Sequence, residues 1–145
     1  MNPSSNSQPW GLTVLRVVVG VVFLIHGCQK LFVFGFHGVA GFLGPLGVPA
    51  PDVFAVILTL VEFVGGALLV LGLFTRWAAW LLAIDMVVAI LLVHLKKGFF
   101  NPQGFEYPLT LLAATTTIAL AGPGAGAVDG VIKTRSEPCT PISEP

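Results

Sequence analysis

The sequence predicts an all-α integral membrane protein, a four-helix bundle whose antiparallel spans are joined by short connections. Of its 145 residues, 55% are apolar, seven are basic and seven are acidic, and the mean hydropathy is +0.92. A soluble domain of this size leaves roughly 30% of its unfolded-chain surface in water, which is too much for so apolar a chain. The apolar residues also form continuous rather than alternating runs, which favours helices over a β-barrel.

Charge and cysteine usage exclude several other classes. The net charge is zero and no basic run is present, so the sequence offers no footprint for nucleic acid. Cys28 and Cys139 form no CxxC pair, which indicates neither a disulfide framework nor a metal site.

Four apolar runs are candidates for the roughly 20-residue helix that crosses a bilayer. They cover residues 12–32, 53–74, 77–95 and 105–122, and a short segment, 1–11, precedes the first. The first run is longer than the apolar core of about 7–15 residues in a signal peptide, so we expect it to be retained as a span.

The connections between the runs differ in character. Only Thr75-Arg76 separates the second and third runs, which predicts a tight hairpin. Residues 33–52 contain no Lys or Arg, and we expect them to lie at the membrane interface or fold back over the bundle, with Asp52 capping the second span. Residues 96–104 form a polar turn on the same side, and 123–145 are predicted to be a flexible tail.

Four spans place both termini on one side of the membrane. That side carries Arg16, Arg76, Lys133 and Arg135, and the other carries Lys30, Lys96 and Lys97. The small excess of basic residues favours cytoplasmic termini.

Three ionisable residues, Arg16, Glu62 and Asp85, lie within the predicted spans. A charge near the centre of a span costs about 2.5–3.5 kcal/mol on insertion scales, so we expect these groups to pair inside the bundle. The prediction is a buried polar network in which Arg16 pairs with Asp85 or Glu62. Such a network needs no function beyond stabilising the bundle.

A second polar group is predicted near the two longer connections. It contains His26, Gln29, Lys30, Glu106 and Tyr107, and we expect Lys30 to pair with Glu106. A structural role is the alternative here too, and Tyr107 points about 100° away from Glu106 on an ideal helix. His94 lies nine residues after Asp85, on the opposite helix face, so we expect it to lie at the interface or to be supported by a loop, and not to share a cavity with Asp85 unless the helix distorts near its end.

The motifs together resemble those of the DoxX family. They are HGxQK at 26–30, ExxGG at 62–66 followed by LGLxTR at 71–76, and GFF at 98–100 before EY at 106–107. The resemblance implies a multi-pass protein of the bacterial inner membrane with cytoplasmic termini. The family positions correspond here to His26, Gln29, Lys30, Glu62, Gly65, Gly66, Arg76, His94, Glu106 and Tyr107.

The resemblance also implies a function. The family takes its name from subunits of an archaeal thiosulfate:quinone oxidoreductase, so we expect a membrane subunit of a redox complex that interacts with quinone. The sequence has no CxxC or CxxCH motif for a cofactor of its own, so electrons would come from a protein partner. The alternative to a protein partner is association of several copies of this chain in a homo-oligomer. The alternatives are a non-catalytic scaffold or assembly factor, a small-molecule transporter, and a b-type haem between His26 and His94.

Overall fold

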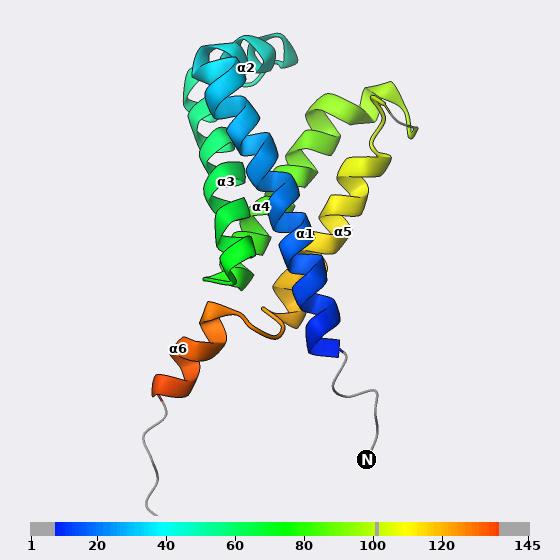
Figure 1. Cartoon of the computed structure of the whole chain (residues 1–145). Helices are drawn as coiled ribbons and strands as arrows, with labels where there is room; N and C mark the ends of the chain where they lie inside the picture. The colour runs from blue at the N-terminus through cyan, green and yellow to red at the C-terminus, as the bar shows by residue number, and fades with distance from the viewer. Residues whose placement is uncertain (1–7, 101, 137–145) are drawn as a thin grey trace, which may run out of the picture.

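The computed structural model describes residues 8–100 and 102–136, and this part of the chain is helical without strands. The α-helices are α1 (Gln8–Cys28), α2 (Gly35–Leu43), α3 (Pro51–Leu71), α4 (Thr75–Ala89), α5 (Glu106–Ala121) and α6 (Val128–Ser136). Two π-helical turns, Gln29–Phe34 and Ile90–His94, extend α1 and α4. In Figure 1, α1 lies beside α3 and α4 beside α5, and the two pairs diverge toward the end that carries α2.

Three helical segments are long and apolar enough to cross a membrane, namely Gln8–Leu46, Pro51–Leu71 and Thr75–Lys97. Their outward faces carry exposed apolar side chains such as Val14, Ile84 and Leu91, which are stable against lipid but costly in water. The prediction of an all-α membrane protein is therefore confirmed. The fourth predicted span corresponds to α5, whose 16 residues reach about 24 Å, less than the thickness of the hydrocarbon core.

Glycines bring α1 and α3 into close contact. A Cβ on Gly27 would lie 2.5 Å from the backbone of Phe63, and one on Gly66 would lie 2.4 Å from the backbone nitrogen of Leu24. A Cβ on Gly20 would meet the Gly66 carbonyl at 2.9 Å. The backbones approach closely only because these positions lack side chains, as is common between membrane helices.

The segment between α1 and α3 folds back over the bundle. Helix α2 packs against α3 through a cluster that contains Val39, Leu43 and Ala55. Asp52 does not cap α3 as predicted: Ala50 occupies the N-cap position in a left-handed conformation, and Asp52 lies in the first turn. The turn between α3 and α4 comes slightly before the predicted break, because Gly72 ends α3 and Thr75 already belongs to α4.

The predicted flexible tail begins with ordered structure. Helix α6 starts at Val128, and Asp129 accepts hydrogen bonds from the backbone N–H groups of Phe74 (2.8 Å) and Thr75 (2.9 Å) at the start of α4. Residues 1–7 of the predicted N-terminal segment, and 137–145 of the tail with Cys139, lie outside the described residues.

Candidate functional site

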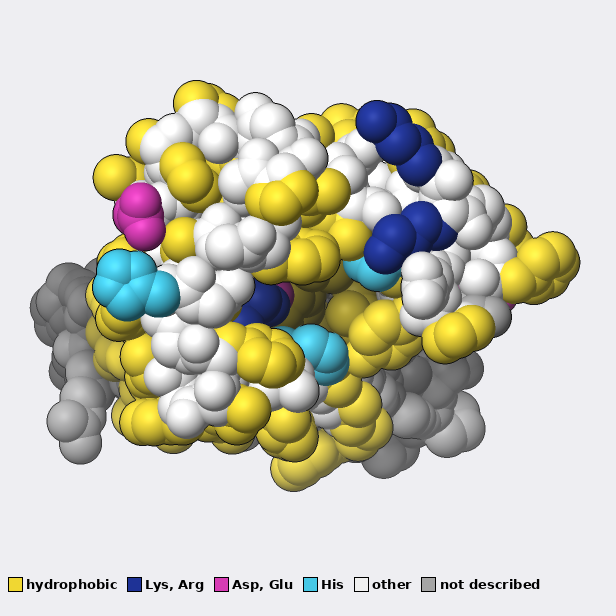
Figure 2. Space-filling view, turned by 90° about the horizontal axis from the view of Figure 1, so that it is seen from above, with side chains coloured by type: hydrophobic (Ala, Val, Ile, Leu, Met, Phe, Trp, Pro, Cys, Tyr) yellow, Lys and Arg dark blue, Asp and Glu magenta, His cyan; other side chains and the backbone are white. Residues whose placement is uncertain are grey.

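A cavity of about 560 Å³ opens at the end of the molecule where the two helix pairs diverge. Its walls come from α1, α2, α3, α4 and α5 and from the connection before α5. Seen from above, the hollow has apolar side chains on its walls and basic and histidine side chains in and around it (Figure 2). Ligand sites commonly have this character, an apolar space with a few polar groups.

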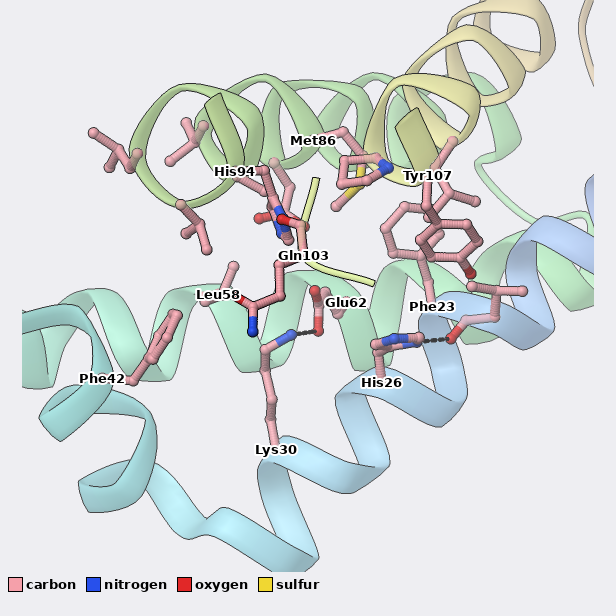
Figure 3. Close-up of a pocket in the computed structure, with 18 of the residues that line it drawn as sticks. Phe23, His26, Lys30, Phe42, Leu58, Glu62, Met86, His94, Gln103 and Tyr107 are labelled. Atoms are coloured by element: carbon pink, nitrogen blue, oxygen red, sulfur yellow. Dashed lines mark hydrogen bonds and ion pairs between the residues drawn. The ribbon is translucent and has the colours of Figure 1, made fainter. Parts of the chain in front are cut away.

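The polar centre of the cavity is the ion pair between Lys30 and Glu62 (Figure 3). Lys30 comes from the π-helical turn after α1, and Glu62 comes from the middle of α3. The Glu62 side chain is 6% exposed and that of Lys30 is 20% exposed. Burial strengthens the attraction, because little water is present to screen it.

Asp85 of α4 adds a second buried carboxyl group to this centre. The residue is 8% exposed and lines the cavity, and its carboxyl group lies near that of Glu62. Its Oδ2 atom is buried and has no hydrogen-bond partner in the described part of the chain.

Two histidines line the same cavity, each held by a backbone carbonyl. His26 Nδ1 lies 2.9 Å from the Val22 oxygen, and His94 Nδ1 lies 2.8 Å from the Gln103 oxygen. A carbonyl only accepts hydrogen bonds, so Nδ1 carries the hydrogen in both rings. In the neutral ring, Nε2 is then an acceptor.

His94 is supported by the loop before α5 through Gln103, and it also lines the cavity with Asp85 because the helix distorts there. The α-helical pattern ends at Ala89, and Ile90–His94 forms a π-helical turn. A π-helix has more residues per turn than an α-helix, so each residue rotates by less than 100°. The smaller rotation brings His94 round toward the side on which Asp85 lies.

The structure separates the members of the second predicted polar group, the one expected near the two longer connections. His26, Lys30 and Tyr107 line the cavity, whereas Gln29 and Glu106 do not. The predicted pairing of Lys30 with Glu106 is also wrong, because Lys30 pairs with Glu62.

Arg16 does not belong to a network with Glu62 and Asp85, contrary to the prediction. Its Nη1 donates hydrogen bonds to the carbonyl oxygens of Leu69 (2.7 Å) and Val70 (3.2 Å) near the C-terminal end of α3. Lys30 lies fourteen positions after Arg16 in continuous helix, a distance of about 20 Å along the axis. Arg16 therefore supplies hydrogen-bond donors to carbonyl groups near the end of α3, whereas Glu62 and Asp85 line the cavity.

Sequence reasoning missed several residues that complete the walls. They include Phe23, Phe42, Leu58, Met86 and Gln103, together with Lys97. Their residue types are common throughout the chain, so only the spatial arrangement distinguishes them from other core or lipid-facing positions. Within the described residues, no group of three or more His, Cys, Asp or Glu side chains is arranged to hold a metal ion.

Comparison with known families and proteins is consistent with this architecture. The model of the DoxX family matches residues 11–95. The chain is 34% identical over 119 residues to the "Putative oxidoreductase CatD" of Bacillus subtilis, covering 82% of this chain and 84% of that protein.

Two further relatives have names that refer to the membrane. "Uncharacterized membrane protein Rv3486" of Mycobacterium tuberculosis is 35% identical over 142 residues, with 90% of this chain and 86% of that protein covered. "Inner membrane protein YphA" of Escherichia coli is 29% identical over 129 residues, with 85% and 91% covered. No solved structure matches the chain.

Proposed function

Because the chain belongs to the DoxX family of membrane proteins, we propose that it is a membrane subunit of an oxidoreductase complex whose cavity binds a quinone headgroup. The observation that carries the proposal is the composition of the cavity. An ion pair, a buried carboxyl group and two histidines lie in a mainly apolar space of about 560 Å³. This volume falls within the range of about 300–1,000 Å³ that small-molecule sites occupy.

The chemistry of a quinone matches these groups. Its headgroup is a flat apolar ring with two carbonyl oxygens, which become hydroxyl groups on reduction. The Lys30 ammonium has three hydrogens, and Glu62 takes one of them, so the others are available to a carbonyl oxygen. Apolar side chains such as Phe23 and Met86 supply surface for the ring.

A protein partner is proposed as the source of electrons, since the sequence has no CxxC or CxxCH motif for a cofactor of its own. The name of the Bacillus subtilis relative refers to an oxidoreductase, and that of the Escherichia coli relative refers to the inner membrane. Both likenesses support a redox complex in a bacterial inner membrane, with this chain as a single copy or a homo-oligomer.

The test is to purify the full chain in mild detergent, extract its lipids and measure bound quinone by chromatography. We expect quinone to co-purify, and Lys30→Met to reduce its occupancy about tenfold or more, because a hydrogen bond from a charged group is lost. Gln29→Leu is the matched control, since Gln29 adjoins Lys30 but does not line the cavity.

Two results would contradict the proposal. One is a folded protein without quinone that co-purifies with another protein, which would favour a scaffold or assembly factor. The other is a Soret absorption band, which would indicate a haem in place of a quinone. Both are read from the same preparation.

A further inference from the structure

A second hollow lies at the end of the molecule opposite the cavity, between the start of α4 and the end of α5. Its volume is about 340 Å³, and its walls are formed by Arg76, Trp77, Trp80, Ala119 and Leu120. Ala119 is buried, whereas the two tryptophans and Leu120 are exposed. The hollow is therefore a groove on the outer surface of the α4–α5 pair, and it shares no residue with the cavity.

Arg76 brings an unpaired positive charge to this groove. The residue is exposed, and within the described part of the chain it forms neither an ion pair nor a hydrogen bond. The carboxylate of Asp129 instead accepts from the backbone N–H groups of Phe74 and Thr75. The Arg76 guanidinium lies close to the turn after α5, because a Cβ on Gly122 would be 3.5 Å from its Nε and Nη2 atoms. Its hydrogen-bond donors are therefore available to a molecule in the groove.

The groove lies where the apolar surface of the bundle ends. Arg76 is the second residue of α4, and Leu120 is the second-to-last residue of α5. Trp77 is 75% exposed, as is typical of tryptophans at the boundary between a membrane and water. Leu81 and Ile84 follow it at helical spacing on the same face of α4 and are also exposed. A molecule with a polar head and an apolar tail matches this sequence of surfaces.

We propose that the groove binds the headgroup of an anionic phospholipid, with the guanidinium of Arg76 on the phosphate. A guanidinium can form two parallel hydrogen bonds with phosphate oxygens. Trp77 and Trp80 would border the glycerol region, and the acyl chains would follow the exposed apolar side chains of α4. Basic pockets between membrane helices bind anionic headgroups in this way. The site is separate from the cavity and does not depend on the proposed function.

The charge of the groove favours an anionic headgroup over a zwitterionic one. A zwitterionic headgroup carries an amine beside its phosphate, and Arg76 would repel that amine. The described walls of the groove contain no acidic residue that could bind the amine. One basic residue near a membrane surface changes the affinity for anionic lipid by about fivefold. We therefore expect about a fivefold preference for phosphatidylglycerol over phosphatidylcholine.

The tryptophans of the groove report directly on the lipid beside them. The chain has three tryptophans, so in a Trp10→Phe parent all tryptophan fluorescence comes from Trp77 and Trp80. Bromine atoms on an acyl chain quench this fluorescence on contact. The full-length parent is reconstituted into vesicles of phosphatidylcholine and phosphatidylglycerol, and each lipid is brominated in turn near the headgroup end of its chains. The two quenching curves give the relative affinity for the two lipids.

We expect brominated phosphatidylglycerol to quench more than its mole fraction predicts, in line with the fivefold preference. Arg76→Gln should lower the preference to about one. Leu120→Glu is a second variant at an exposed position of the groove, and it should do the same because its carboxylate neutralises Arg76. Lys96→Gln is the control, since it removes one positive charge from an exposed residue outside the groove and the cavity. Thermal unfolding checks that each variant is folded.

Four results would overturn the proposal. The first is equal affinity of the parent for the two lipids. The second is a preference that persists in the folded Arg76→Gln or Leu120→Glu variant, which would place its origin elsewhere. The third is weak quenching by both lipids, which would mean that a second copy of the chain covers the groove. The fourth is loss of the preference in inorganic phosphate but not in sodium chloride of equal ionic strength, which would assign the groove to a soluble phosphate compound.

Discussion

Lys30 and Glu62 stabilise each other at a position where neither charge is well hydrated. Removing one member of a buried pair commonly costs about 3–5 kcal/mol, because the other charge remains buried without compensation. Lys30→Met leaves Glu62 and Asp85 together without the cation, and we expect it to lower the free energy of unfolding by about this amount. Chemical unfolding in detergent measures the change.

The double variant Lys30→Met, Glu62→Gln is the control for that prediction. Glutamine is neutral and has nearly the shape of glutamate, so no uncompensated charge remains at position 62 and the double variant should be more stable than Lys30→Met alone. Additive effects of the two changes would show that the residues are not coupled.

Asp129 has a different role, because it binds the N-terminal N–H groups of α4 from outside the predicted spans. Burial opposes ionisation of this carboxyl group, but the hydrogen bonds from Thr75 and Phe74 and the attraction of Arg16 outweigh it and lower the pKa of Asp129. We expect Asp129→Ala to cost about 1 kcal/mol at pH 7, as loss of a helix cap does.

The pH dependence of that cost follows from the direction of the shift. Since the pKa is lower in the folded state, the contribution of Asp129 is fully present above the ordinary Asp pKa of about 3.9 and is lost as pH falls through the folded value. The difference in free energy of unfolding between wild type and Asp129→Ala should shrink as the pH is lowered from 5. Unfolding measured at a series of pH values tests this. A constant difference would contradict the hydrogen-bonding role of the carboxylate.

At the scale of elements, the packing of α1 on α3 depends on glycines rather than on large side chains. Gly66→Ala would place a Cβ 2.4 Å from the Leu24 nitrogen, and a backbone atom cannot move aside as a flexible side chain can. Overpacking costs typically about 1–3 kcal/mol, so we expect a loss of at least this size. Thermal unfolding in detergent is the measurement.

Gly11→Ala in α1 is the matched control, because its Cβ would have no neighbour within 4 Å. Alanine is favoured over glycine in a helix by about 0.8–1.0 kcal/mol, so this variant should be as stable as wild type or more so. Equal effects of the two substitutions would mean that the close approach of α1 and α3 does not determine stability.

The sequence predicts the helices better than it predicts their contacts. The continuous apolar runs and their length identify the helical class. The rule of 100° per residue fails at His94 because the π-helical turn is not visible in the hydropathy pattern. The partners of Arg16 also escape prediction, because the cost of a buried charge calls for a partner but does not say that the carbonyls at the end of α3 lie within reach of Arg16.

At the scale of the whole molecule, the two ends have different roles. At one end, hydrogen bonds connect segments that are far apart in the sequence. The Thr13 hydroxyl donates to the Ala125 carbonyl at 2.7 Å, and Asp129 of α6 accepts from a backbone N–H at the start of α4. The other end holds the cavity, between helices that diverge. Both ends of the described chain lie at the first of these, opposite the cavity (Figure 1).

Orientation in the membrane therefore decides which compartment the cavity faces. The basic residues favour cytoplasmic termini, which would turn the cavity toward the outer side. In a variant with Cys28 and Cys139 changed to serine, His37→Cys reports on the cavity end, because the side chain of His37 is fully exposed. Val131→Cys, on the exposed surface of α6, reports on the opposite end.

A membrane-impermeant maleimide applied to spheroplasts should modify His37→Cys without lysis and Val131→Cys only after lysis. If the membrane leaks, both cysteines will react without lysis. If a cysteine reacts poorly with the maleimide, it will remain unmodified even after lysis. The reverse pattern would place the cavity on the cytoplasmic side. With the reverse pattern, a partner that supplies electrons would have to bind on the cytoplasmic side, because the cavity and its ion pair between Lys30 and Glu62 would face that side.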